Sequence, residues 1–219
     1  MKPTTPNDTP QAAEIVSKIL ADEQTLLTDK RKEHRESLVM PVRISQASFD
    51  FALEGFTRDI SANGLCLIAP QPFRQGTEVS IGLSTESTQI ESPATCCWSA
   101  KFGKTYWISG WRLSETLPVA RLLKDDHSVE PEQRAKDRLK TAIPVNINLI
   151  NYASRIASFT RDLTSDGVSL VSKVATASGQ TAWLEIMQLD GESNSLESNC
   201  LWSKRYGTDH WVSGWDFNV

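Results

Sequence analysis

The chain has 219 residues, of which 39% are hydrophobic and 23% are charged, and its formal net charge is -4 at pH 7. Such a composition can bury ordinary hydrophobic cores and excludes a chain that is disordered overall. The acidic balance argues against a protein that holds nucleic acid mainly by general attraction to the phosphate backbone, so an anionic ligand must be met by local positive charge.

The N-terminal region combines a polar start with a helical pattern. Met1 to Pro10 lack the basic and then apolar sequence of a secretory signal, and no stretch approaches the ~18 apolar residues that span a bilayer. We therefore expect a cytoplasmic protein without a membrane span. From Pro10 to about Leu27 apolar residues recur at helical spacing, which predicts a flexible N-terminus and an amphipathic helix over residues 1–28.

Alternating apolar and polar residues then indicate short strands, for example at Val42 and Ile44 and at Leu65 and Leu67. A period of two places one face of each strand in a core. Several such stretches, separated by Gly, Ser, Asn and Pro, predict a small antiparallel β-barrel over residues 29–116.

The barrel is followed by a stretch with two parts. Pro118 to Leu123 is compatible with a second short helix, whereas Lys124 to Pro131 is charged and ends in proline, as linkers do. We assign residues 117–131 to a linker that contains this helix.

The second half of the chain repeats the first at a shift of 103 residues, which becomes 104 after one insertion. Phe56–Asp59 (FTRD) recurs as Phe159–Asp162, and Trp107–Trp111 (WISGW) recurs as Trp211–Trp215 (WVSGW). A repeat of this length, present twice, indicates duplicated domains rather than a solenoid. We therefore expect a second barrel over residues 132–219.

Each copy carries two arginines four positions apart and, further on, an Asp-x-Ser/Thr-x-x-Gly turn. The residues are Arg31, Arg35, Asp59, Ser61 and Gly64 in the first copy and Arg134, Arg138, Asp162, Thr164 and Gly167 in the second. This order of motifs resembles the signature of PilZ domains, over about Asp29 to Leu113 and Glu132 to Phe217. The resemblance implies a mainly β protein with two tandem, six-to-seven-stranded antiparallel PilZ-like barrels that bind cyclic di-GMP without turnover.

The residue types suit that ligand, which presents two phosphates and two guanines. The planar fork of arginine matches phosphate oxygens and the guanine O6/N7 edge, and a carboxylate accepts guanine N–H groups. Glycine allows a positive φ or a close backbone approach at the turn. Alternatively, each Asp-x-Ser/Thr-x-x-Gly turn merely links two strands. Thr164 keeps the hydroxyl of Ser61 but is stiffer, so we expect the second site to be weaker.

The remaining conspicuous residues favour structural roles. The repeated tryptophans are expected to pack in the barrels, and Arg58 and Arg161, which precede the motif aspartates, are secondary candidates on the opposite face. The cysteines form no CxxC pair and the histidines differ between copies, so we expect buried free thiols, no metal and no cofactor. The sequence lacks the common catalytic motifs, which argues against an enzyme.

The sequence therefore predicts a cytoplasmic receptor in which cyclic di-GMP orders the arginine segments. Ordering would reposition the helix before Arg31 and the linker before Arg134, and would change the domain angle or the contacts with a downstream protein partner. One alternative is a PilZ-like adaptor that binds proteins of motility or exopolysaccharide machinery without a ligand. The presence of both arginine pairs counts against it. Another is a small-barrel nucleic-acid binder, which the net charge disfavours.

Overall fold

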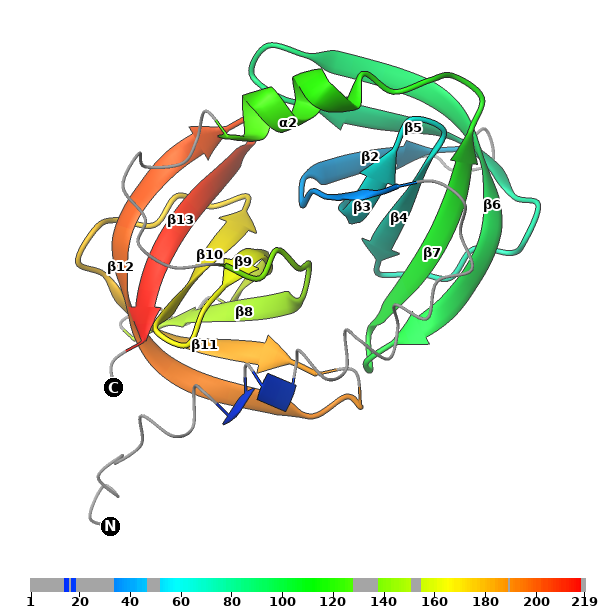
Figure 1. Ribbon diagram of the computed structural model, residues 1–219. Coiled ribbons are helices and arrows are strands. Elements are labelled where there is room, and N and C mark those ends of the chain that lie inside the picture. Colours follow the sequence, from blue (N-terminus) through cyan, green and yellow to red (C-terminus); the bar gives the residue numbers. More distant parts are fainter. Residues whose placement is uncertain are drawn as a thin grey trace, which may run out of the picture.

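The computed structural model describes residues 14–15, 17–18, 34–46, 52–127, 138–150, 155–188 and 190–217, and it contains two β-barrels side by side (Figure 1). The first barrel comprises β1 (Glu36–Ser37), β2 (Pro41–Ser45), β3 (Leu53–Ser61), β4 (Gly64–Ala69), β5 (Glu78–Ser84), β6 (Gln89–Phe102) and β7 (Tyr106–Leu113). The second comprises β8 (Pro144–Leu149), β9 (Arg155–Leu163), β10 (Gly167–Ser172), β11 (Thr181–Met187), β12 (Ser193–Tyr206) and β13 (His210–Phe217).

Both sheets close by the same antiparallel pairings. The first follows the order β3-β2-β5-β6-β7-β4, is closed by pairing of β3 with β4, and carries β1 on the far side of β3. The second is closed in the equivalent order β9-β8-β11-β12-β13-β10. The predicted fold class, two tandem antiparallel barrels of six to seven strands, is confirmed.

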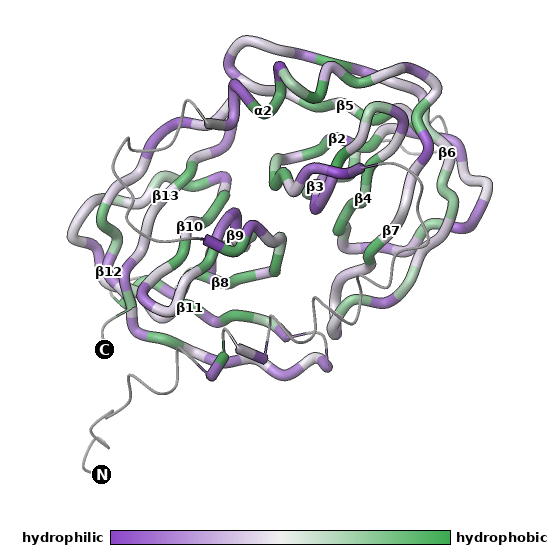
Figure 2. The backbone as a smooth tube through the Cα atoms, viewed as in Figure 1, coloured by the Kyte–Doolittle hydropathy of each residue, from purple (hydrophilic) through white to green (hydrophobic). Residues whose placement is uncertain are grey.

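Side chains that point inward from the strands fill the two barrel cores. Hydrophobic residues are prominent along β2 and β4 in Figure 2. The predicted packing of tryptophans is confirmed for Trp111 and Trp215, which are both buried. Their indole N–H groups donate to Ser109 Oγ and Ser213 Oγ, each at 2.8 Å, which satisfies the polar atom inside the core. The packing expectation fails for Trp98 on β6, which is 38% exposed. The expectation of buried thiols fails for Cys97, which is exposed, although the other cysteines are buried and all are free.

The helix α2 (Val119–His127) follows the first barrel and is longer than predicted. Leu122 is fully buried in a hydrophobic cluster that consists mainly of first-barrel residues and also includes Val171, Tyr206 and Val212 of the second barrel. Lys124 to His127, expected as linker, continue this helix because Asp125 binds the β5–β6 turn. Its Oδ2 accepts hydrogen bonds from the hydroxyls of Thr85 at 2.5 Å, Ser87 at 2.7 Å and Thr88 at 2.9 Å.

Equivalent residues of the two copies meet where the barrels touch. Phe56 stacks on Phe159 with ring centroids 4.2 Å apart. Tyr106 meets Phe159 edge-on at 5.2 Å, and His210, its counterpart in the repeat, meets Phe56 edge-on at 5.9 Å. The barrels are therefore related by an approximate two-fold axis that passes near the stacked phenylalanines.

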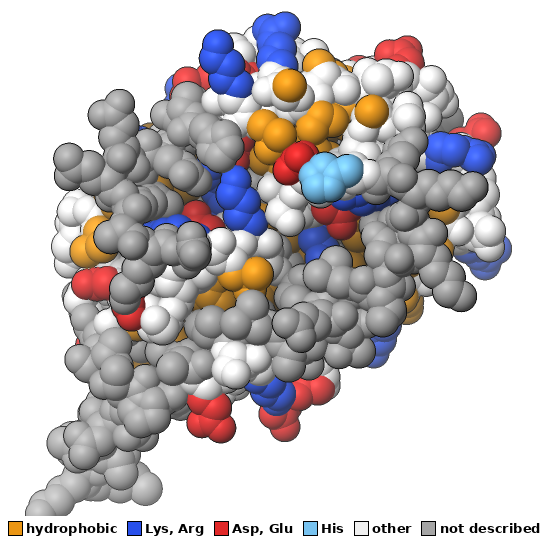
Figure 3. Space-filling model, viewed as in Figure 1, with side chains coloured by type: hydrophobic (Ala, Val, Ile, Leu, Met, Phe, Trp, Pro, Cys, Tyr) orange, Lys and Arg blue, Asp and Glu red, His pale blue; other side chains and the backbone are white. Residues whose placement is uncertain are grey.

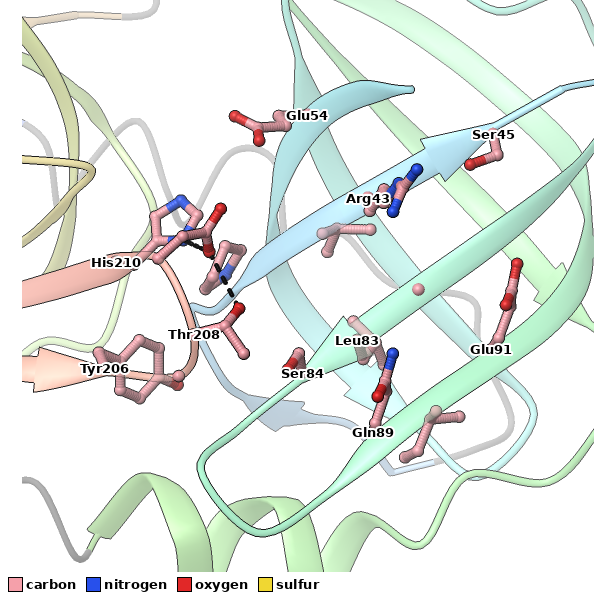
Figure 4. A pocket seen from close by; sticks show the side chains of 16 residues that line it. Arg43, Ser45, Glu54, Leu83, Ser84, Gln89, Glu91, Tyr206, Thr208 and His210 are labelled. Carbon is pink, nitrogen blue, oxygen red and sulfur yellow. Dashed lines mark hydrogen bonds and ion pairs between the residues drawn. The ribbon is translucent and has the colours of Figure 1, made fainter. Parts of the chain in front are cut away.

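The hairpin between β12 and β13 reaches across to the first barrel. It closes one side of a pocket of about 400 Å³ on the outer face of β2, β5 and β6. In Figure 4, His210 and Thr208 approach this pocket from the second barrel, whereas Arg43 and Glu54 approach it from the first. Glu54 also forms an ion pair with Lys173 of the second barrel at 2.5 Å. The contact between the barrels is thus apolar at its centre and polar at its edge.

Candidate functional site

Arg35 and Asp59 face each other on the first barrel. Arg35 directly precedes β1, and the pairing of β1 with β3 sets Ser37 opposite Asp59. Nη1 of Arg35 donates to Oδ1 of Asp59 at 2.5 Å, and the two side chains are 20% and 14% exposed. The strand pairing therefore brings the second arginine of the pair to the motif aspartate while leaving both within reach of a ligand.

The rest of the turn lies beside this ion pair. The Ser61 hydroxyl donates to the carbonyl oxygen of Gly64 at 3.2 Å. Gly64 does not have a positive φ. A Cβ at this position would stand 2.7 Å from the carbonyl oxygen of Trp111 and 3.2 Å from Nη2 of Arg35. Glycine is therefore required by close approach of β7 and of the Arg35 side chain.

Gly64→Ala is expected to lower the free energy of unfolding by about 1–3 kcal/mol, because the new methyl group overlaps the backbone of β7. Denaturant unfolding of the full chain measures the change. Gly82→Ala on β5 is the matched control, since its Cβ would meet its nearest atoms at 3.6 Å. Equal stability of the two variants would contradict the steric argument.

The second barrel repeats the arrangement. Nη1 of Arg138 donates to Oδ1 of Asp162. Leu139 bridges Leu163 as Glu36 pairs with Ile60 in the first barrel. Asp162 is only 3% exposed on its side chain, compared with 14% for Asp59. The second carboxylate is therefore less accessible than the first.

Thr164 takes the place of Ser61 in the second turn. Its hydroxyl donates to the carbonyl oxygen of Gly167 at 3.2 Å and accepts from the backbone N–H of Gly167 at 3.2 Å. A Cβ on Gly167 would overlap the carbonyl oxygen of Trp215, as in the first copy. The structure thus brings together Arg35, Asp59, Ser61 and Gly64, and separately Arg138, Asp162, Thr164 and Gly167. Arg31 and Arg134 lie outside the described residues.

The family model described as "PilZ domain" matches residues 29–121, which contain the whole first barrel and both of its motifs. The first barrel is a PilZ domain. The second barrel is related to this PilZ domain by the repeat and by the same strand order. No curated protein matches the chain.

Several solved structures resemble the chain at low identity. PlzA of Borreliella burgdorferi, in complex with c-di-GMP, is 13% identical over 83% of this chain and 81% of that one, with a TM-score of 0.33. YcgR of Escherichia coli, in complex with c-di-GMP, is 10% identical over 97% and 84%, with a TM-score of 0.34. The inhibitor of motility MotI of Bacillus subtilis is 10% identical over 84% and 90%, with a TM-score of 0.33.

A threonine that the motifs do not include anchors the arginine segment to the PilZ domain. Thr57 Oγ1 donates to the carbonyl oxygen of Leu38 at 2.5 Å and accepts from the N–H of Met40 at 3.0 Å. Thr160 makes the equivalent bonds to Thr141 and Ile143 in the second barrel. The recurrence of FTRD in the sequence pointed to this threonine, because Thr57 and Thr160 are repeated together with the motif aspartates.

A buried ionic cluster joins α2 to the second barrel. Arg161 Nη2 lies 2.8 Å from Oδ2 of Asp126, and the Tyr206 hydroxyl donates to Oδ1 of Asp126 at 3.0 Å. All three side chains are almost fully buried. Burial raises the pKa of Tyr206 well above its ordinary value, and the charge of Asp126 raises it further, so the phenol remains a donor. Arg161, a secondary candidate from the sequence, is therefore a structural partner of α2.

Charged side chains surround the two candidate sites. Figure 3 shows basic and acidic side chains next to one another in the middle of the face that it presents. Among the described residues, no group of three or more His, Cys, Asp or Glu side chains could hold a metal ion. None of the described helices is long and apolar enough to cross a membrane.

Proposed function

We propose that this chain is a cyclic di-GMP receptor with one site on each barrel. Arg31, Arg35, Asp59, Ser61 and Gly64 form the first site, and Arg134, Arg138, Asp162, Thr164 and Gly167 form the second. The observation that carries the proposal is the recurrence of the Arg35–Asp59 ion pair as Arg138–Asp162, beside equivalent turns in both barrels.

The chemistry of each site matches the ligand group by group. A pair of arginines supplies two positive charges for the two phosphates, and a guanidinium can also lie flat on a guanine. The carboxylate of Asp59 or Asp162 accepts guanine N–H groups. Without ligand, the ion pair holds Arg35 beside Asp59, so both groups are already positioned and less ordering is required on binding.

The arginine pairs favour a receptor over a ligand-free adaptor. A scaffold that only binds proteins has no need for an ion pair conserved in geometry between two barrels at the family's ligand motif. We propose binding without catalysis, with an altered domain angle or an altered contact with a protein partner as output. The proposal includes the domain limits 29–116 and 132–219, with residues 1–28 before the first barrel and 117–131 between the barrels.

Isothermal titration calorimetry of the intact chain with cyclic di-GMP tests the function. We expect a binding isotherm that is lost when Arg31→Ala is combined with Arg134→Ala. The linear dinucleotide pGpG is the control ligand and is expected to bind more weakly, because it is not preorganised. Absence of heat with cyclic di-GMP in the unsubstituted chain would overturn the proposal, and salt-sensitive binding of single-stranded nucleic acid in its place would indicate a nucleic-acid binder.

A further inference from the structure

Arg112 of β7 lies beside the first site, on the outer face of the PilZ domain. The register pairs Arg112 with Gly64 of the motif turn, so the Cα atoms of the two residues are about 5 Å apart. A Cβ on Gly64 would stand 3.2 Å from Nη2 of Arg35, so the guanidinium of Arg35 lies over this glycine. The side chain of Trp111 is buried in the core and that of Arg112 is exposed. Arg112 therefore points outward on the side of the sheet where Arg35 lies.

The charge of Arg112 has no counterion within the described part of the chain. Arg35 is paired with Asp59, whereas Arg112 takes part in no hydrogen bond or ion pair among the described residues. Thr95 pairs with Arg112 on one side and with Glu78 on the other, so Glu78 lies two strands from Arg112. Two strand spacings are about 10 Å, a distance at which salt screens the attraction between exposed charges. The first site therefore carries one guanidinium more than its carboxylate neutralises, and this charge is free to bind an anion.

The second barrel has an acid where the first has Arg112. Asp216 follows Arg112 by 104 positions, and it pairs with Gly167 of the second motif turn. Oδ1 of Asp216 accepts a hydrogen bond from the backbone N–H of Asn199 at 3.2 Å, which fixes the position of the carboxylate. A phosphate at this flank of the second site is therefore repelled, since like charges at neighbouring positions of a sheet destabilise each other.

Lys140 supplies a cation at the opposite flank of the second site. Leu139 and Leu163 bridge each other and pack in the core of the second barrel. The next residues, Lys140 and Asp162, therefore face outward and stand opposite each other, as Ser37 stands opposite the motif aspartate in the first barrel. Lys140 is partly buried and has no ion-pair partner in the described ranges. Each site thus has a third cation, but on a different side.

We propose that Arg112 and Lys140 are further ligand-binding residues, and that they place the phosphates of cyclic di-GMP differently in the two sites. In the first site, Arg112 binds a phosphate beside Gly64. In the second site, Asp216 excludes phosphate from that flank, and Lys140 binds one beside Asp162. The two barrels thus recognise the same dianion from different sides. The inference rests on the proposed function and adds one specificity-determining cation to each site.

Calorimetry with cyclic di-GMP tests these two residues when each site is measured alone. Arg138→Ala leaves the first site, and Arg35→Ala leaves the second. In these backgrounds Arg112→Ala is expected to weaken the first site by about 5- to 20-fold, and Lys140→Ala to weaken the second by a similar factor, because one charge pair near the protein surface is worth about this much. Neither change is expected to affect the other site.

Three further variants separate an electrostatic role from a structural one. Arg112→Lys keeps the charge and is expected to recover most of the affinity that Arg112→Ala loses. Arg112→Ala should also make the affinity of the first site less sensitive to salt, which a change in packing would not do. Asp216→Asn keeps an acceptor for the N–H of Asn199, and we expect it to strengthen the second site by about 3- to 10-fold. Lys101→Ala, the matched control, removes an exposed cation six residues beyond Thr95 on β6, about 20 Å away, and should change neither site.

The results distinguish this inference from the receptor function on which it rests. An unchanged first site in Arg112→Ala, or equal weakening of both sites by either alanine variant, would overturn the inference while leaving the receptor function intact. A loss in Arg112→Ala that Arg112→Lys does not reduce would also overturn it, because the charge would then not be the cause. Absence of heat in the unsubstituted chain would overturn the receptor function itself and this inference with it.

Discussion

Replacing Arg35 with alanine is expected to weaken cyclic di-GMP binding to the first barrel by about 30- to 3,000-fold, which corresponds to about 2–5 kcal/mol. Arg35 is the described member of the arginine pair that lies at the motif aspartate, 2.5 Å from Asp59, and is mostly buried. Its loss removes a charge-assisted contact to the ligand and leaves Asp59 without the guanidinium that neutralises it. Calorimetry of the full chain measures the affinity and the number of ligands bound.

Three further variants test whether the loss of affinity in Arg35→Ala comes from the proposed site. Arg35→Lys keeps the charge but loses the planar fork, so we expect it to recover only part of the affinity. Arg43→Ala removes an exposed arginine of β2 that lies outside the proposed site and should leave binding unchanged. Arg138→Ala should remove the second, weaker binding event. Unaltered affinity in Arg35→Ala, with the fold intact, would exclude Arg35 from the ligand site.

Asp126→Ala is expected to lower the free energy of unfolding by about 3–5 kcal/mol, the cost of leaving one partner of a buried ion pair uncompensated. Asp126 and Arg161 are each 2% exposed, so water does not replace the lost carboxylate. Tyr206 would lose its acceptor at the same time. Urea unfolding of the full chain, monitored by tryptophan fluorescence, provides the measurement.

The double variant Asp126→Leu with Arg161→Met tests whether the uncompensated charge of Arg161 causes the loss of stability in Asp126→Ala. Removing both charges eliminates the desolvated guanidinium, and we expect it to regain most of the stability that Asp126→Ala loses. A loss of about 1 kcal/mol or less in Asp126→Ala would indicate a pair that behaves as though it were exposed.

The sequence predicted the barrels because their signal is local and is present twice. Alternation at Val42 and Ile44 reports a buried strand face directly, and the recurrence of FTRD fixed the duplication. The proximity of Arg35 to Asp59 was predictable in the same way, because a family motif pairs these positions. The need for glycine at position 64 was predicted as well, but only the structure shows that the obstacle is the carbonyl oxygen of Trp111.

Contacts between segments far apart in the chain had no such signal. Asp126 looked like part of a charged linker, since neither its neighbours nor its spacing reveal Arg161 and Tyr206. Docking of Ile15 in the core of the second barrel was hidden for the same reason, because an amphipathic helix shows that it has a partner but not which one. The two-fold relation rests on the stack of Phe56 on Phe159, which no local sequence pattern predicts.

The stack of Phe56 on Phe159 joins two halves of one polypeptide. Two separate barrels that met in this way would dissociate on dilution, and their pairing would depend on how much protein the cell makes. Joined in one chain, they meet at an effective concentration that the connecting segment sets, on the order of millimolar for a short connection. The response of this protein to its ligand is therefore expected to be independent of its own expression level.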